Sequence, residues 1–206
     1  MRSPLPASAF GPPPRRRVGL LGGSFNPAHS GHRHLSEHAL KLLRLDEVWW
    51  LVSPQNPLKP AKDMASLAQR VAGARRVARH PRMRVSATEA RLGTRYTADT
   101  LKALRQRFPR TRFVWLMGAD NLIQIARWEN WSSIFHIMPV AVFARPAYSL
   151  RALAGLSAHR FRRHRRDPRR GRQLASARPP AWIFFHSRLD AASATSIREA
   201  RRAARR

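Results

Sequence analysis

The sequence predicts an α/β fold in which a mainly parallel sheet carries helices on both faces. Short apolar runs that stop at glycine, proline or polar residues alternate along the chain with helical segments. Strands that alternate with helices of about 10 to 15 residues are typical of βαβ units. Right-handed crossovers between parallel strands then place helices on both faces of the sheet. With 206 residues, 43% of them hydrophobic, the chain is long enough for a single domain with a substantial core.

The first half of the chain begins with a tail and continues with regular elements. Residues 1–17 are expected to form a disordered, basic and proline-rich tail, because three consecutive prolines suit neither a sheet nor a helix interior. A short apolar run predicts a strand over 18–21 that stops at two glycines. Leucine and alanine at helical spacing predict a helix over 30–44. The run EVWWLVS predicts a second strand over 47–53.

The second half repeats the alternation. An alanine-rich segment predicts a helix over 66–79, and Thr97 is the expected N-cap of a helix over 97–108. Apolar runs predict the remaining strands over 82–87, 112–117, 139–144 and 182–186. The run FRRHRRDPRRGR is too charged to pack, so 151–172 is expected to be an exposed loop or frayed helix. It belongs to an exposed basic insert over 151–180, within one domain of residues 18–206.

Composition excludes several classes of protein. The chain has no cysteine, which excludes a disulfide scaffold, a thiolate metal site and a cysteine nucleophile. It has no apolar run of about 18 residues and no secretion signal at its start, so a cytoplasmic protein without a membrane partner is expected. Lys and Arg number 40 against 11 Asp and Glu, for a formal charge of +29. Such an excess indicates either polyanionic ligands or compositional drift, because nearly all the basic residues are arginine.

The loop after the first strand carries the most chemical information. It reads GGSFNPAHSGH over residues 22–32, with His29 and His32 at the start of the next helix. Free backbone amides at a helix start bind anions, and two imidazoles beside them add donors to phosphate oxygens. The loop is neither a P-loop nor a G-x-G-x-x-G dinucleotide fingerprint. Ligands of parallel sheets bind at the carboxyl ends of the strands, which here are followed by Gly22–Phe25, Ser53–Lys59 and Gly118–Asn121.

A second candidate anion site lies near the end of the chain. The hydroxyls of Ser193 and Thr195 favour a helix start, and Arg198 follows one turn later with a guanidinium that suits phosphate. An ordinary capped helix with solvated arginines would have the same pattern. Together with the histidine loop, the pattern favours a triphosphate held between two helix starts.

These motifs resemble those of the nucleotidyltransferase superfamily marked by His/Thr-x-Gly-His, with His29 to His32 in that role, and within it those of the bacterial nicotinate-nucleotide adenylyltransferases. The blocks GGSFNPAHSGH, SPQNPLK, RYTADTL and MGADN, the Trp128/Trp131 pair and the final SATSIR occur in the expected order. The resemblance implies a Rossmann-like fold, transfer of the adenylyl group of ATP to nicotinate mononucleotide, release of pyrophosphate, and Mg²⁺ held by the ATP phosphates. In the expected mechanism His32 binds the α-phosphate and His29 assists.

The expected site residues fall into two groups. Those for ATP are Gly22, Gly23, Ser24, Phe25, His29, His32, Ser193, Thr195 and Arg198. Those for nicotinate mononucleotide are Asn56, Lys59, Tyr96, Thr97, Asp120, Trp128 and Arg145. Some alternatives stay open: Trp131 as a structural residue, Lys59 as a solvated side chain, and Arg145 as part of a surface ion pair rather than a phosphate contact.

Other functions are weighed against this one. The same scaffold could take nicotinamide mononucleotide or phosphopantetheine as acceptor, and a basic nucleic-acid-binding protein is the alternative from another class, although no nucleic-acid partner is expected. His34 and His38 have the spacing of zinc ligands but lack a third ligand, and Ser24 lacks the base and acid of a hydrolase triad. A homo-oligomer is compatible with the sequence.

Overall fold

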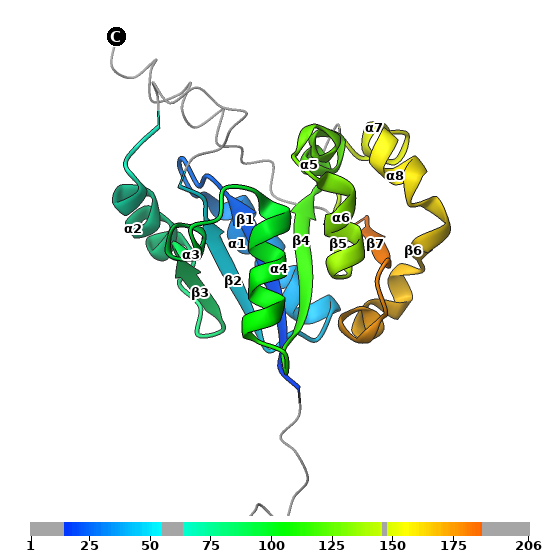
Figure 1. The fold of residues 1–206 in the computed structure, drawn as a ribbon, viewed down its shortest axis with the longest axis horizontal. Helices are drawn as coiled ribbons and strands as arrows, with labels where there is room; N and C mark the ends of the chain where they lie inside the picture. Colours follow the sequence, from blue (N-terminus) through cyan, green and yellow to red (C-terminus); the bar gives the residue numbers. More distant parts are fainter. Residues whose placement is uncertain (1–14, 55–63, 146–147, 187–206) are drawn as a thin grey trace, which may run out of the picture.

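A computed structural model describes residues 15–54, 64–145 and 148–186 of the chain (Figure 1). A parallel sheet forms its centre, with strands in the order β3-β2-β1-β4-β5-β7-β6. Because every pairing among the described strands is parallel, all their carboxyl ends point to the same edge. The predicted α/β, Rossmann-like class is confirmed.

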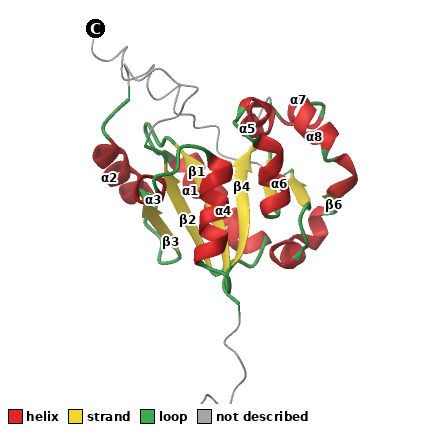
Figure 2. Ribbon diagram, viewed as in Figure 1, coloured by secondary structure: helices red, strands yellow, loops and turns green. Residues whose placement is uncertain are grey.

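Helices and strands alternate along the chain as the sequence predicts (Figure 2). The strands are β1 (Arg17–Gly23), β2 (Glu47–Val52), β3 (Met83–Ser86), β4 (Arg112–Gly118), β5 (Val140–Phe143), β6 (Arg165–Arg166) and β7 (Trp182–Phe185). The α-helices are α1 (Ser30–Leu42), α2 (Leu67–Val77), α3 (Thr88–Leu92), α4 (Thr97–Arg107), α5 (Ala119–Gln124), α6 (Trp131–Ile137), α7 (Ser149–Leu153) and α8 (Leu156–Arg160). Short 3₁₀ segments are η2 (Ile125–Arg127), η3 (Arg162–His164) and η4 (Pro168–Ser176).

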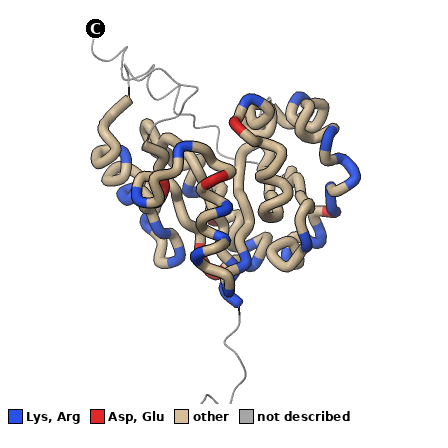
Figure 3. The backbone as a smooth tube through the Cα atoms, in the orientation of Figure 1, with Lys and Arg blue, Asp and Glu red and all other residues tan. Residues whose placement is uncertain are grey.

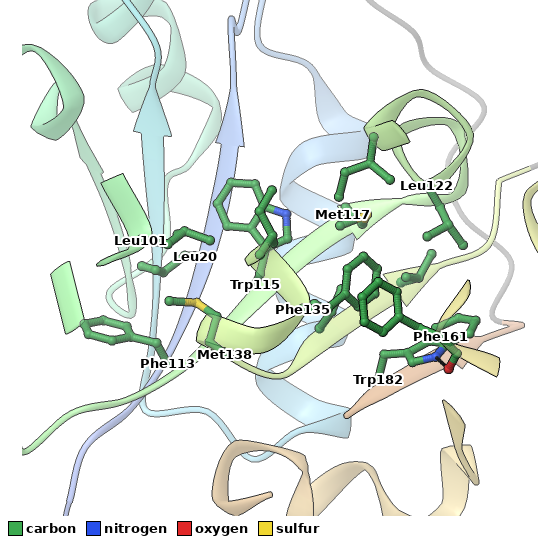
Figure 4. Packing of buried hydrophobic residues seen from close by; sticks show 14 of the residues in the cluster. Leu20, Leu101, Phe113, Trp115, Met117, Leu122, Phe135, Met138, Phe161 and Trp182 are labelled. Carbon is green, nitrogen blue, oxygen red and sulfur yellow. Dashed lines mark hydrogen bonds between the residues drawn. The ribbon is translucent and has the colours of Figure 1, made fainter. Parts of the chain in front are cut away.

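The sheet separates two hydrophobic cores, because successive side chains of a strand point to opposite faces. Leu20, Trp115 and Trp182 point to the face covered by α4, α5 and α6, where Figure 4 shows their packing. Leu21 and Trp50 point to the other face, under α1, α2 and η4. In Figure 1, α4 accordingly lies in front of the sheet and α1 behind it.

The structure differs from the sequence prediction in two regions. Arg17, which the sequence places in the expected tail of residues 1–17, belongs to β1, and its backbone N–H donates to Asp46. Residues 1–14 of that expected tail lie outside the described residues. Residues 151–172 do not form a loop or a single frayed helix. They form α7, α8, β6 and two 3₁₀ segments, because apolar residues such as Phe161 and Leu174 pack into the cores while the arginines between them stay exposed.

The topology marks one position at the sheet edge. From β1 the chain runs outward through β2 to β3, returns to β4 on the other side of β1, and continues to β5 and β7. The order therefore reverses between β1 and β4, and crevices at such points are the usual ligand sites of open parallel sheets. Among the described residues no helix is long and apolar enough to cross a membrane.

Candidate active site

The loop after β1 leaves the sheet at the point where the strand order reverses. Gly22 and Gly23 are the last residues of β1, and a Cβ on Gly22 would collide with the ring of Trp115. Glycine is therefore needed at this position for packing inside the protein, whatever binds above it. Phe25 follows with a positive φ of 47°, its ring only 2% exposed. The ring of Phe25 is thus not available to a nucleotide.

His29 and His32 meet at the start of α1. His29 is the N-cap residue and His32 lies three residues later, with their ring centroids 3.8 Å apart. The backbone N–H of His29 donates to Nδ1 of His32 at 3.2 Å. Because Nδ1 of His32 accepts this bond, the proton of the neutral ring belongs on Nε2. His32 can therefore present an Nε2–H donor beside the amides of the helix start.

Aromatic rings hold His32 in place from the core side. Phe25 stacks on Trp50 at 5.0 Å between centroids and an angle of 7°, and the His32 ring lies 4.8 Å from Phe25. The indole N–H of Trp50 donates to the Ser36 hydroxyl, which in turn donates to the carbonyl of His32. The packing connects the loop, α1 and β2, so the imidazole position is set before any ligand arrives.

Arg70 on α2 is a site residue that the sequence reasoning missed. Its side chain reaches the loops after β1 and β2, and it is only 3% exposed. Its guanidinium donates to the carbonyls of Ser24 (2.8 Å), Ser53 (2.7 Å), Pro54 (2.7 Å) and Ala65 (2.9 Å). Burial lowers the pKa of Arg70 from its ordinary value. From the sequence alone, an arginine within an alanine-rich helix is expected to be solvated. Only the burial of Arg70 distinguishes it from the exposed arginines of the same helix.

Asp120 and Arg145 follow β4 and β5 at the same edge of the sheet as the histidine loop. Asp120 is in the first turn of α5, directly after β4, and its Oδ1 lies 3.2 Å from Nε of Arg145, which follows β5. Both side chains are more than two-thirds buried, and Gly118 leaves room for them, since a Cβ there would meet both. Of the alternatives for Arg145, the structure contains the ion pair.

Tyr96 and Thr97 begin α4, as N-cap and first helical residue. The segment before them is tied down by the hydroxyl contact of Thr94 with Thr100 at 2.7 Å and by the bond from the Thr94 N–H to the Glu89 carbonyl. Glu89 itself is 6% exposed, and burial raises the pKa of its carboxyl to about 7. In the described part of the chain, that carboxyl has neither a hydrogen bond nor an ion pair.

The two tryptophans differ in their surroundings. Trp131 starts α6 and packs edge-on against Phe135 and Phe161, with centroids 6.5 and 6.0 Å away, which is a structural role. Trp128 follows η2 and is half-buried against the same core. Trp128 therefore has an accessible portion that a pyridine ring could meet.

Several predicted site residues lie outside the described residues, namely Asn56, Lys59, Ser193, Thr195 and Arg198. Their place relative to the histidines stays a prediction. No group of three His, Asp or Glu that could hold a metal ion occurs in the described ranges, and the rings of His34 and His38 contact each other at 4.3 Å.

The fold and the histidine loop define a nucleotidyltransferase, and comparison with known proteins agrees. The chain belongs to the cytidylyltransferase-like family, whose model matches residues 20–200.

Within that family the curated relatives share one name. A protein of Cereibacter sphaeroides (strain ATCC 17025) called "Probable nicotinate-nucleotide adenylyltransferase" is 55% identical over 181 residues, covering 88% of this chain and 96% of its own length. A protein of Parvibaculum lavamentivorans with the same name is 53% identical over 186 residues, covering 90% of this chain and 92% of its own.

Solved structures share the fold. Nicotinic acid mononucleotide adenylyltransferase of Plasmodium falciparum, in complex with NaAD, has a TM-score of 0.65 at 14% identity, covering 89% of this chain and 83% of that one. The same enzyme in complex with APC has a TM-score of 0.63.

Proposed function

We propose that this protein transfers the adenylyl group of ATP to nicotinate mononucleotide, a step of NAD biosynthesis in the cytoplasm. The names and coverage of the relatives support the enzyme class and the reaction. The observation that carries the assignment of the site is the His29–His32 pair, set at a helix start on the carboxyl edge where the strand order reverses.

The reaction needs no covalent enzyme intermediate. A phosphate oxygen of nicotinate mononucleotide attacks the α-phosphorus of ATP, the new P–O bond forms, and the bond to the bridging oxygen of pyrophosphate breaks. Negative charge develops on the oxygens around phosphorus and on the leaving group. Catalysis therefore consists of positioning the two nucleotides and stabilising this charge.

In our proposal the chain's own residues divide the work. His32 donates from Nε2 to an α-phosphate oxygen, and His29 and the amides at the start of α1 hold neighbouring phosphate oxygens. Ser193, Thr195 and Arg198 hold the β and γ end. On the other side of the crevice, Tyr96 and Thr97 face the nicotinate carboxylate with the free amides of α4, and Trp128 stacks on the ring.

Asp120 and Arg145 have a modified role in this proposal. Because they pair with each other, Arg145 orients the Asp120 carboxylate toward a ribose hydroxyl rather than binding phosphate by itself. Asn56 and Lys59 complete the contacts to ribose and phosphate.

Mg²⁺ is part of the proposal as a partner of ATP. An ion held by phosphate oxygens and water needs no cluster of protein carboxylates. When bound, it would neutralise phosphate charge. Removal with EDTA should abolish pyrophosphate release, and added Mg²⁺ should restore it.

The deciding experiment measures pyrophosphate release from ATP with nicotinate mononucleotide, nicotinamide mononucleotide or phosphopantetheine as acceptor. We expect the largest kcat/KM for nicotinate mononucleotide, since discrimination is the ratio of these constants. A larger value for either other acceptor would replace the substrate in the proposal, and no release with any of the three would contradict adenylyl transfer itself.

A further inference from the structure

We propose that an open groove on the edge of the sheet farthest from β3 binds the phosphodiester backbone of a nucleic-acid duplex, independently of its sequence. The arginine groove, as we call it, has a volume of about 440 Å³ and is lined by Arg163, His164, Arg165, Arg166, Asp167 and Arg170. It involves no residue of the candidate active site. The proposal goes beyond adenylyl transfer and does not depend on it.

Within the described residues, the positive charge of the groove lining outnumbers its negative charge. Residues 151–180 contain ten arginines and one acidic residue, Asp167. That carboxylate already accepts from the backbone N–H of Arg169, where it caps η4. Within the described part of the chain, none of the groove arginines forms an ion pair, and all of them are exposed. Their hydrogen-bond donors are therefore available to an external anion.

The arginines of the groove lie on a backbone that is held by strand pairing and by packing into the cores. β6 pairs with the first residues of β7, and Phe161 and Leu174 anchor the flanking segments in the two cores. The guanidinium of Arg165 lies over the rings of Trp182 and Phe184, at 5.6 and 5.8 Å. This stacking uses the flat face of the guanidinium and leaves its N–H edge for phosphate oxygens.

The shape of the charged surface favours an extended polyanion over a single small one. Figure 3 shows basic residues following one another along the rim from α8 past β6 to η4. A row of positive charge matches the regular row of phosphates in a nucleic acid. Among the groove residues no Phe, Tyr or Trp ring is exposed for an unpaired base to stack on, and the one exposed ring of the groove lining is the imidazole of His164. Duplex is therefore favoured over single strand.

The groove and the nucleotide site also lie at opposite ends of the parallel strands. β6 pairs with Trp182 and Ile183, at the amino end of β7. The histidine loop and Asp120 lie at the carboxyl ends of β1 and β4. A duplex in the groove would thus leave the active-site edge open, and both ligands could be bound at once.

The test compares two variants that remove the same charge from different places. The groove variant is Arg163→Gln/Arg166→Gln/Arg170→Gln. The matched control is Arg75→Gln/Arg107→Gln/Arg110→Gln, which changes three exposed arginines on other elements. Fluorescence anisotropy with labelled 24-bp duplexes of random sequence, one of DNA and one of RNA, gives Kd over a range of salt concentrations, and thermal unfolding verifies that both variants fold.

We expect the wild type and the control to bind with a steep salt dependence. In the groove variant Kd should rise at least about tenfold at low salt, and the slope of log K against log salt for DNA should fall by about 3, since each phosphate contact contributes about 0.9. Binding of either duplex that weakens only in the groove variant supports the proposal and identifies the nucleic acid. Equal weakening in both triple variants, or no binding by the wild type, overturns it. Pyrophosphate release should be unchanged in the groove variant, so failure of this proposal is distinct from failure of adenylyl transfer.

Discussion

His32 shows how one side chain acquires a defined role. The backbone N–H of His29 donates to Nδ1, the rings of Phe25 and Trp50 pack on the imidazole from the core side, and in our proposal Nε2 donates to a phosphate oxygen. A donor whose direction is set before binding costs no reorganisation in the transition state.

The first prediction concerns this donor. His32→Ala should lower kcat by about 10²- to 10³-fold, as expected for a donor that acts mainly in the transition state. The KM for ATP should change much less. The control is His38→Ala on the same helix, which should keep turnover close to the wild-type value. A folded His32→Ala protein with near-normal kcat would refute the mechanism.

Arg70 is the second residue whose surroundings define it. It joins α2 to the loops after β1 and β2 through bonds to neutral carbonyls only. Arg70→Lys keeps the charge but lacks the planar fork, so we expect a loss of about 2–3 kcal/mol in the free energy of unfolding and a higher KM for ATP. Urea denaturation and steady-state kinetics measure the two effects.

Arg75→Lys on the same helix is the matched control for Arg70→Lys. Arg75 is exposed, and a surface change of this kind should stay within about 0.5 kcal/mol. If both variants were equally stable and equally active, the four carbonyl contacts of Arg70 would have no role in holding the loops.

Glu89 makes stability depend on pH. Burial raises the pKa of its carboxyl to about 7 in the folded protein, whereas the ordinary value is 4.5. The folded state therefore holds the proton more tightly, and the stability that Glu89 contributes is present below about pH 4.5 and lost as pH rises through about 7. Glu89→Gln stays neutral. Its free energy of unfolding relative to wild type should increase by about 3 kcal/mol between about pH 4 and pH 8.

Urea denaturation at the two pH values checks the Glu89 prediction. Glu129→Gln, at an exposed carboxylate, should show no comparable change. A Glu89→Gln difference that is the same at both pH values would mean that the carboxyl of Glu89 has the same pKa in the folded and unfolded states.

At the scale of elements, the two ends of the strands have different roles. The carboxyl ends of β1, β4 and β5 lead to His29, Asp120 and Arg145. At the amino ends of the strands, Glu47 connects several residues through its carboxylate. At the start of β2 it accepts from Arg16 (2.7 Å), Trp49 (2.8 Å) and Arg84 (2.9 Å).

Glu47 should therefore matter for stability and not for catalysis. Burial alone would raise the pKa of Glu47, but the hydrogen bonds from Arg84 and Trp49 and the charge of Arg16 hold it below its ordinary value. Its contribution is present above about pH 4.5 and is lost as pH falls. Because both arginine partners are exposed, we expect Glu47→Gln to cost about 1–2 kcal/mol at neutral pH, with unchanged kcat.

Chemical denaturation at neutral and acidic pH measures the Glu47 effect. Glu37→Gln breaks an exposed ion pair between residues four apart on a helix and should cost no more than about 0.5 kcal/mol. A Glu47 variant as stable as the Glu37 variant would show that screening removes the benefit of the buried carboxylate.

At the scale of the whole molecule, a well-packed interior is combined with a large excess of positive charge. Two cores fill both faces of the sheet, while the formal charge is +29. Positive charges that outnumber their partners repel one another and destabilise the compact state, and salt screens this repulsion. We expect Tm to rise when sodium chloride is increased from about 0.05 to about 0.3 M, by about 2–4 °C for each 1 kcal/mol of repulsion removed. Calorimetry measures the shift, and a constant or falling Tm would contradict it.

The alternation of elements and the chemistry of the first loop follow from the sequence alone. All nine helices and strands expected from apolar periodicity are present, with ends that differ by no more than two or three residues. The family could also be identified from ordered motifs. These properties are local, since the period of apolar residues and the order of a motif depend on neighbours along the chain.

The contacts between residues that are distant in sequence are visible only in the folded protein. The tertiary structure brought Arg70 to two loops, paired Asp120 with Arg145, and placed the ring of Phe25 in the core rather than against a nucleotide. It also made residues 151–180 an ordered part of the sheet edge, because a few apolar side chains far apart in sequence found the cores between the arginines. Burial and pairing of this kind depend on contacts between residues that are distant in sequence. The sequence does not show whether a charged residue is exposed to solvent or buried under a loop.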